Sequence, residues 1–255
     1  MIALIVKELR HYAGQRKFRH IQLIIIGLLS LVLLISAFEL FAYAQRGGQF
    51  NVGYGIYSIL VIAIFIMLLC LVVPLQAIEA AQIESLNSNI DLLRISPLST
   101  WKQLAAKLLA SIIAALWSVW LVTPLFWFSI YSGGLTLNQI FACFLVYVAS
   151  ISLFSMIGIC FAFSAHPVQA RVRSFSTILL IIFLPLISLW ALPFDDSLLS
   201  LLNTLSPVSV LLSIVGWYPN TFMTGFSPWS WMACVYFVAS TILFWIAAKR
   251  HIGAY

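Results

Sequence analysis

The segment Glu79–Lys107, EAAQIESLNSNIDLLRISPLSTWKQLAAK, separates two strongly apolar stretches and holds three of the chain's seven carboxylates. Apolar residues recur in it every three or four positions, at Ile83, Leu86, Ile90 and Leu93. This spacing predicts an apolar stripe along a short helix, with polar residues on the other side. Ser96-Pro97 ends that helix, because proline disfavours helical geometry in the residue before it. Thr100 and Gln103 have the spacing of a capping box and start the next helix. The pattern is also typical of an ordinary cytoplasmic loop with a solvated face.

The same segment carries a more specific set of residues: Ile83-Glu84, the run Asp91–Ser99 (DLLRISPLS) and Lys107. This set resembles the first cytoplasmic loop of ABC-2 type transporter permeases. That loop has a Glu-Arg pair, a Gly-Thr-Leu-Glu segment, a Leu-Leu-x-x-(Ser/Thr)-Pro turn and a Lys that opens the third span. In the present chain Ser85 stands in place of the Arg, and residues 87–89 (Asn-Ser-Asn) replace the Gly-Thr part.

The resemblance implies that residues 79–101 form a coupling loop whose helix sits in a groove of a separate ATPase subunit. The contact residues that it implies are Ile83, Glu84, Leu86, Ile90, Asp91, Leu93, Arg94 and Pro97. It further implies two ATPase copies, which bind the ATP and Mg²⁺, and a second permease chain as homodimer or related heterodimer. The transport pathway would lie between the two permease chains, in the plasma membrane of a bacterium.

The composition places the whole chain in a membrane. Of its 255 residues 63% are hydrophobic and only 8% are charged, whereas a soluble globular domain has about 25% charged residues. Apolar stretches long enough to cross the hydrocarbon layer recur along it, and backbone groups in that layer must pair within their own segment, so helices are expected. The basic residues form no dense stripe interleaved with aromatics, which argues against nucleic-acid binding.

These stretches predict an all-α integral membrane protein that forms a single transmembrane domain over residues 1–255. Six spans are expected, at residues 21–43, 56–78, 104–130, 138–165, 175–192 and 231–248. In this topology both termini are cytoplasmic, and Arg46 is the only one of the 13 Lys and Arg residues on the outer side. That asymmetry is what the positive-inside rule predicts.

Residues 1–20 are basic and amphipathic, which predicts a helix lying in the headgroup plane with its apolar side down. The apolar face is formed by Ile2, Ile5, Val6, Leu9 and Ala13. The apolar run that follows is too long for a signal peptide, so cleavage after Ala44 is disfavoured. Glu39 near the outer end of that run is either a proton or substrate group or a side chain that snorkels to the interface.

The segment 193–228 contains no Lys or Arg and is too apolar for a free loop. Two apolar pieces flank Ser206-Pro207, which fits an outer re-entrant hairpin before the last span, as the resemblance also implies. The alternative is one interfacial helix that rests on the outer surface.

Motifs for chemistry are absent from the sequence. It contains no phosphate-binding G-x-x-x-x-G-K-[ST] loop, no H-E-x-x-H and no G-x-S-x-G elbow. We therefore expect no enzymatic activity, cofactor or metal in this chain itself. Two functions remain open: the permease subunit of an ABC exporter with a lipid-like or amphiphilic substrate, and a secondary transporter or channel without an ATPase. The second would normally show paired polar or charged residues at mid-membrane.

Overall fold

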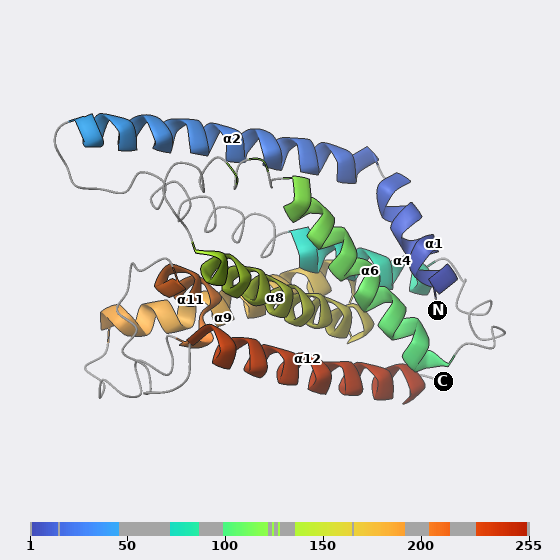
Figure 1. Ribbon diagram of the computed structural model, residues 1–255. Coiled ribbons are helices and arrows are strands. Elements are labelled where there is room, and N and C mark those ends of the chain that lie inside the picture. Colours follow the sequence, from blue (N-terminus) through green and yellow to red (C-terminus); the bar gives the residue numbers. More distant parts are fainter. Residues whose placement is uncertain are drawn as a thin grey trace.

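The computed structural model describes residues 2–14, 16–45, 72–86, 99–121, 136–164, 166–191, 204–214 and 228–253, together with Pro124 and Trp127. The regular secondary structure in these ranges is helical and includes no strand, which confirms the all-α prediction (Figure 1). The helices are α1 (Ile2–Gly14), α2 (Arg16–Gln45), α4 (Val73–Leu86), α6 (Thr100–Leu121), α8 (Leu137–Ser164), α9 (Pro167–Ala191), α11 (Pro207–Ile214) and α12 (Pro228–Gly253).

Within the described ranges, three helices are long and apolar enough to cross a bilayer. They contain the segments Trp101–Trp120 in α6, Leu137–Ala162 in α8 and Pro228–Lys249 in α12, of 20, 26 and 22 residues. Because about 20 apolar residues cross the hydrocarbon layer, these helices identify a membrane-embedded protein. The predicted first and fifth spans overlap α2 and α9, and most of the predicted second span lies outside the described residues.

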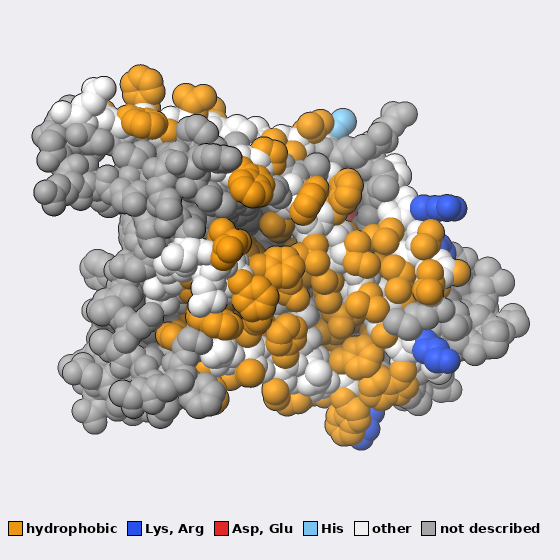
Figure 2. Space-filling view, in the orientation of Figure 1, with side chains coloured by type: hydrophobic (Ala, Val, Ile, Leu, Met, Phe, Trp, Pro, Cys, Tyr) orange, Lys and Arg blue, Asp and Glu red, His pale blue; other side chains and the backbone are white. Residues whose placement is uncertain are grey.

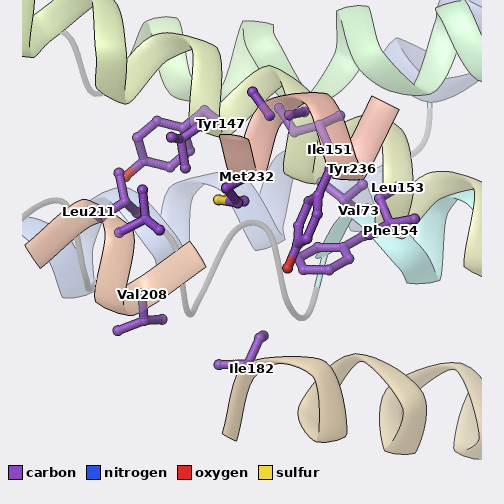
Figure 3. Close-up of a cluster of buried hydrophobic side chains, with 14 of the residues drawn as sticks. Val73, Tyr147, Ile151, Leu153, Phe154, Ile182, Val208, Leu211, Met232 and Tyr236 are labelled. Atoms are coloured by element: carbon purple, nitrogen blue, oxygen red, sulfur yellow. The ribbon is translucent and has the colours of Figure 1, made fainter. Parts of the chain in front are cut away.

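Helix α8 lies at the centre of the bundle, in contact with α4, α6, α9, α11 and α12. Within the most apolar 18-residue window of its span 72% of the residues are buried, against 33% for α12. Every residue from Ile151 to Ile159 is buried. Figure 3 shows side chains from α8, α11 and α12 meeting in the main hydrophobic cluster, among them Tyr147, Leu211 and Met232. A central helix that is apolar all round is expected to be covered by its neighbours.

Helix α4 approaches α8 at Gly158, where two backbones lie almost in contact. A Cβ atom at this position would be 2.9 Å from the carbonyl oxygen of Pro74 and 3.2 Å from the Cβ of Ala77. Small residues allow such close approach between membrane helices, where van der Waals contact takes the place of a hydrophobic driving force. Gly158 therefore sets the distance between α4 and α8.

The expected inner loop at residues 166–174 is wrong, because this stretch is part of α9. Pro167 is the first helical residue, and the carbonyl of His166 accepts a hydrogen bond from the Ala170 amide at 2.8 Å. Proline favours the first position of a helix, since its fixed φ suits helical geometry and its missing N–H would be unpaired there in any case. Arg171 and Arg173 thus lie on the first turns of a long helix.

The N-terminal region also differs from the prediction of one interfacial helix over residues 1–20. Helix α1 ends at Gly14, and the basic residues from Arg16 onward begin α2. Ile5 and Leu9 of α1 pack against Ala110 and Ala114 of α6, so this part of the predicted membrane-facing stripe is covered by protein. Ile2 and Val6 remain exposed on the flank of the helix.

The short helix α11 is built into the bundle at three points. At its start, the Ser206 hydroxyl donates to the Ile182 carbonyl at 3.1 Å, and the Tyr236 hydroxyl donates to the Leu205 carbonyl at 2.8 Å. The residues from Pro207 to Leu211 are buried. Tyr236 lies eight residues into α12, which at 1.5 Å per residue places the start of α11 roughly 12 Å along that helix.

Candidate functional site

Five helix termini meet at one end of the bundle, which we call the basic end. Here α4, α8 and α12 end and α6 and α9 begin. The rings of Trp101 on α6 and Phe244 on α12 lie 5.2 Å apart, and Arg171 on α9 pairs with Glu79 on α4 at 3.4 Å. A buried cluster joins four of these helices, α4, α6, α8 and α12: Ala77, Leu104, Met156, Ile159, Ala247 and Ala248.

Exposed cations gather at this end, and Figure 2 shows Lys and Arg side chains at the edge of a broad hydrophobic face. The exposed cations of its helices α6, α9 and α12 are Lys102, Arg171, Arg173 and Lys249. The ion pair of Arg171 with Glu79 has both side chains nearly half exposed, so we expect it to contribute only about 0–1 kcal/mol to stability.

The predicted coupling residues divide between the end of α4 and the segment that follows it. The backbones of Ile83, Glu84 and Leu86 lie in the last turn of α4, which runs without a break from Val73 through Glu79. Ile90, Asp91, Leu93, Arg94 and Pro97 lie outside the described residues. The first part of the predicted coupling helix is thus the last turn of α4 rather than a separate helix.

The start of α6 differs by one residue from the predicted capping box. The Ser99 carbonyl accepts hydrogen bonds from the amides of Lys102 and Gln103, at 2.9 and 3.2 Å. Thr100 is therefore the first helical residue and Ser99 occupies the capping position.

Buried polar side chains, which the sequence analysis did not single out, gather toward the basic end. Gln76 and Gln82 of α4, Gln103 and Lys107 of α6, and Glu8 of α1 are each 5–8% exposed. The helical spacing of the buried polar residues in α6 could have indicated their burial. The face of α6 that α1 covers carries residues three and four positions apart: Gln103, Lys107, Ala110 and Ala114. Buried charges require paired or hydrogen-bonded surroundings, so we expect Glu8 and Lys107 to have polar partners inside the bundle.

At the opposite end, Gln139 joins the beginning of α8 to the end of α11. The side-chain Oε1 of Gln139 accepts a hydrogen bond from the backbone N–H of Thr136 at 3.0 Å. The backbone N–H of Gln139 donates in turn to the Thr136 hydroxyl at 3.4 Å. This is a capping box. The Nε2 of the same side chain donates to the Ile214 carbonyl at 3.0 Å. One amide group therefore caps one helix and satisfies a terminal carbonyl of another.

Replacing Gln139 with Glu should separate these two roles. The Glu carboxylate can still accept the hydrogen bond from the Thr136 amide, but it has no N–H to donate to the Ile214 carbonyl. A carboxylate oxygen would face that carbonyl oxygen instead. An unsatisfied buried group costs about 1–3 kcal/mol, so we expect a lower melting temperature and faster hydrogen exchange in α11. Asn138→Asp makes the same chemical change at the exposed neighbouring residue and serves as the control. Equal exchange rates in the two variants would show that the bond does not hold α11.

The described residues outline an α-helical integral membrane protein with a charged end and a hydrophobic face. Within them, no group of three or more His, Cys, Asp and Glu side chains is arranged to hold a metal ion. No protein-family model and no curated protein matches the chain.

Proposed function

We propose that this chain is the permease subunit of an ABC-2 type transporter, with the segment after α4 as the contact to a separate ATPase. The observation that supports the proposal is that α4 ends and α6 begins at the same basic end. Residues 87–98, which hold most of the motif, lie between these two helices in the sequence. A coupling loop must leave and re-enter the membrane on the side where the ATPase lies.

The proposed topology has six spans and places the basic end in the cytoplasm. Helices α6, α8, α9 and α12 supply four spans, α2 supplies the first, and the second ends in α4. The exposed Lys and Arg side chains at the basic end support this orientation through the positive-inside rule. Both termini would then be cytoplasmic, with α1 as a connecting helix beside α6.

We propose that α11 is one limb of an outer re-entrant hairpin. Its burial and its depth along α12 favour this over a helix resting on the surface. Its backbone is covered by protein rather than lipid, which is the condition for such a hairpin. Two permease chains and two ATPase copies would form the transporter, with ATP and Mg²⁺ bound by the ATPases. The cargo would be lipid-like or amphiphilic.

A pull-down with a matched pair of variants tests the proposal. Leu86→Ala with Ile90→Ala removes two apolar anchors from the coupling segment. The control, Leu109→Ala with Ile113→Ala, truncates one leucine and one isoleucine at the same spacing on the exposed face of α6. We expect the tagged parent and the α6 variant to bring down a P-loop ATPase from native membranes. The coupling variant should lose it, since interface anchors commonly contribute more than about 1 kcal/mol each.

The reconstituted complex gives the second measurement. ATP hydrolysis should require the partner subunit and should fall in the coupling variant, while the isolated chain should show none. If the parent brings down no ATPase, or if the coupling variant binds and stimulates it like the parent, the permease proposal fails.

The buried charges Glu8 and Lys107 favour one other candidate, a secondary transporter without an ATPase. Ionisable side chains inside a membrane protein often form ion or proton pathways. Both residues, however, lie in the α1–α6 contact toward the basic end. Uptake or export driven by a proton gradient in vesicles that contain only this chain would support the secondary transporter.

A further inference from the structure

Two lysines at the basic end have aromatic neighbours and no carboxylate partner among the described residues. Lys249 lies 3.6 Å above the centre of the Trp245 ring. Lys102 follows Trp101, whose ring contacts Phe244, the residue before Trp245. Lys102 and Lys249 are thus one and five residues away in the sequence from the Trp101–Phe244 contact that joins α6 and α12, and we refer to this region as the corner between the two helices.

The described acidic side chains are engaged elsewhere. Glu8 is buried in α1, and Glu79 pairs with Arg171. Among the described residues, therefore, no carboxylate neutralises Lys102 or Lys249 at this corner. The first turn of α6, at the same corner, adds the partial positive charge of a helix N-terminus.

An apolar face extends from this corner along both helices. Helices α6 and α12 meet at the basic end and diverge away from it, with α8 between them (Figure 1). The exposed side chains of the three helices are large and apolar, as Figure 2 shows for this face of the molecule. They include Leu109, Ile113 and Trp117 of α6, Phe144 of α8, and Val238 and Ile242 of α12.

We infer that this corner binds an anionic phospholipid of the leaflet that meets the basic end. Its phosphate would lie between Lys102 and Lys249, and its acyl chains would lie along the face between α6 and α12. Charge complementarity selects an anionic headgroup, because a zwitterionic one brings its own cation to the two lysines. Basic sites between membrane helices recognise anionic headgroups in this way, and indole rings favour the headgroup level.

The position gives such a lipid a direct influence on the segment before α6. Lys102 lies only four residues after residue 98, where the stretch proposed to contact the ATPase ends. A bound headgroup would hold the first turn of α6 and the end of α12 together. The inference rests on the geometry of the corner and is independent of the proposed ATPase partner.

Lipid retention tests the inference on the purified full chain. Native mass spectrometry would count phosphatidylglycerol and phosphatidylcholine bound to the protein from mixed micelles. The test variant is Lys102→Gln with Lys249→Gln. The control is Lys7→Gln with Arg173→Gln, which removes two exposed cations from α1 and α9. We expect the parent to prefer phosphatidylglycerol and the test variant to bind it roughly thirty-fold more weakly, since each cation near an anionic surface contributes about a fivefold factor.

The control variant should bind phosphatidylglycerol with an affinity within about threefold of the parent's. The variant Lys102→Arg with Lys249→Arg should still prefer phosphatidylglycerol over phosphatidylcholine, because it keeps both charges. Equal losses in the test and control variants would show a general positive field and would overturn the inference. Equal retention of the two lipids by the parent would also overturn it. Inorganic phosphate alone should leave the melting temperature unchanged, and protection equal to that of phosphatidylglycerol would mean a site for free phosphate instead.

Discussion

Neutralising either Glu8 or Lys107 alone should destabilise the protein more than most single substitutions. Glu8 is 6% exposed and Lys107 is 5% exposed, and they lie on the two helices that pack through Ile5, Leu9, Ala110 and Ala114. Breaking a buried ion pair by removing one partner typically costs about 3–5 kcal/mol, because the other charge stays buried and uncompensated. We therefore expect Glu8→Gln and Lys107→Met to lower the melting temperature by on the order of 10 °C.

A double-mutant cycle measures whether the two charges compensate each other. The combined variant Glu8→Gln with Lys107→Met should be more stable than either single variant, because no buried charge is left alone. Lys7→Met removes an exposed ammonium from α1, the helix that carries Glu8, and should change the melting temperature little. Additive losses in the combined variant would contradict a paired arrangement and would mean that each charge is satisfied separately.

Replacing Gly158 with Ala should destabilise the contact between α4 and α8. The added Cβ would lie 2.9 Å from the Pro74 carbonyl oxygen, a backbone atom that moves only if α4 moves. Overpacking of this kind typically costs about 1–3 kcal/mol. It opposes the gain of up to about 1 kcal/mol that Ala brings to a helix interior. The net result should be a lower melting temperature.

Gly27→Ala provides the matched control for that substitution. Gly27 also lies within a helix, α2, but no atom lies within 4 Å of the position its Cβ would take. This variant should therefore keep the melting temperature or raise it, because only the helix-propensity term remains. If both variants raised it equally, α4 would not be held against α8 at this point.

Much of the helical architecture could be predicted from apolar length alone. The predicted fourth span, 138–165, lies within one residue of α8 at each end, because a long apolar run bounded by polar residues admits one solution in a bilayer. Helix starts were harder. The predicted fifth span begins only at residue 175, after the charged residues, whereas α9 begins at Pro167 and includes Arg171 and Arg173, because proline suits the first position of a helix.

Packing partners were beyond the reach of sequence patterns. The apolar stripe of α1 predicted a membrane contact, but Ile5 and Leu9 pack against α6, and lipid and protein offer equally apolar surroundings to such residues. The capping box of Thr136 and Gln139 has a recognisable spacing in the sequence. Its second bond, to Ile214, joins residues far apart in the chain and follows only from the fold.

The close approach at Gly158 also decides how the helices could move. With the Pro74 backbone against α8, α4 and α8 are expected to turn as one stiff body rather than slide past each other. A displacement of α4 at Leu86 would then be transmitted directly to α8 at the centre of the bundle. Any movement at the end opposite the basic end would then be taken up between α6 and α12, which contact each other less than each contacts α8.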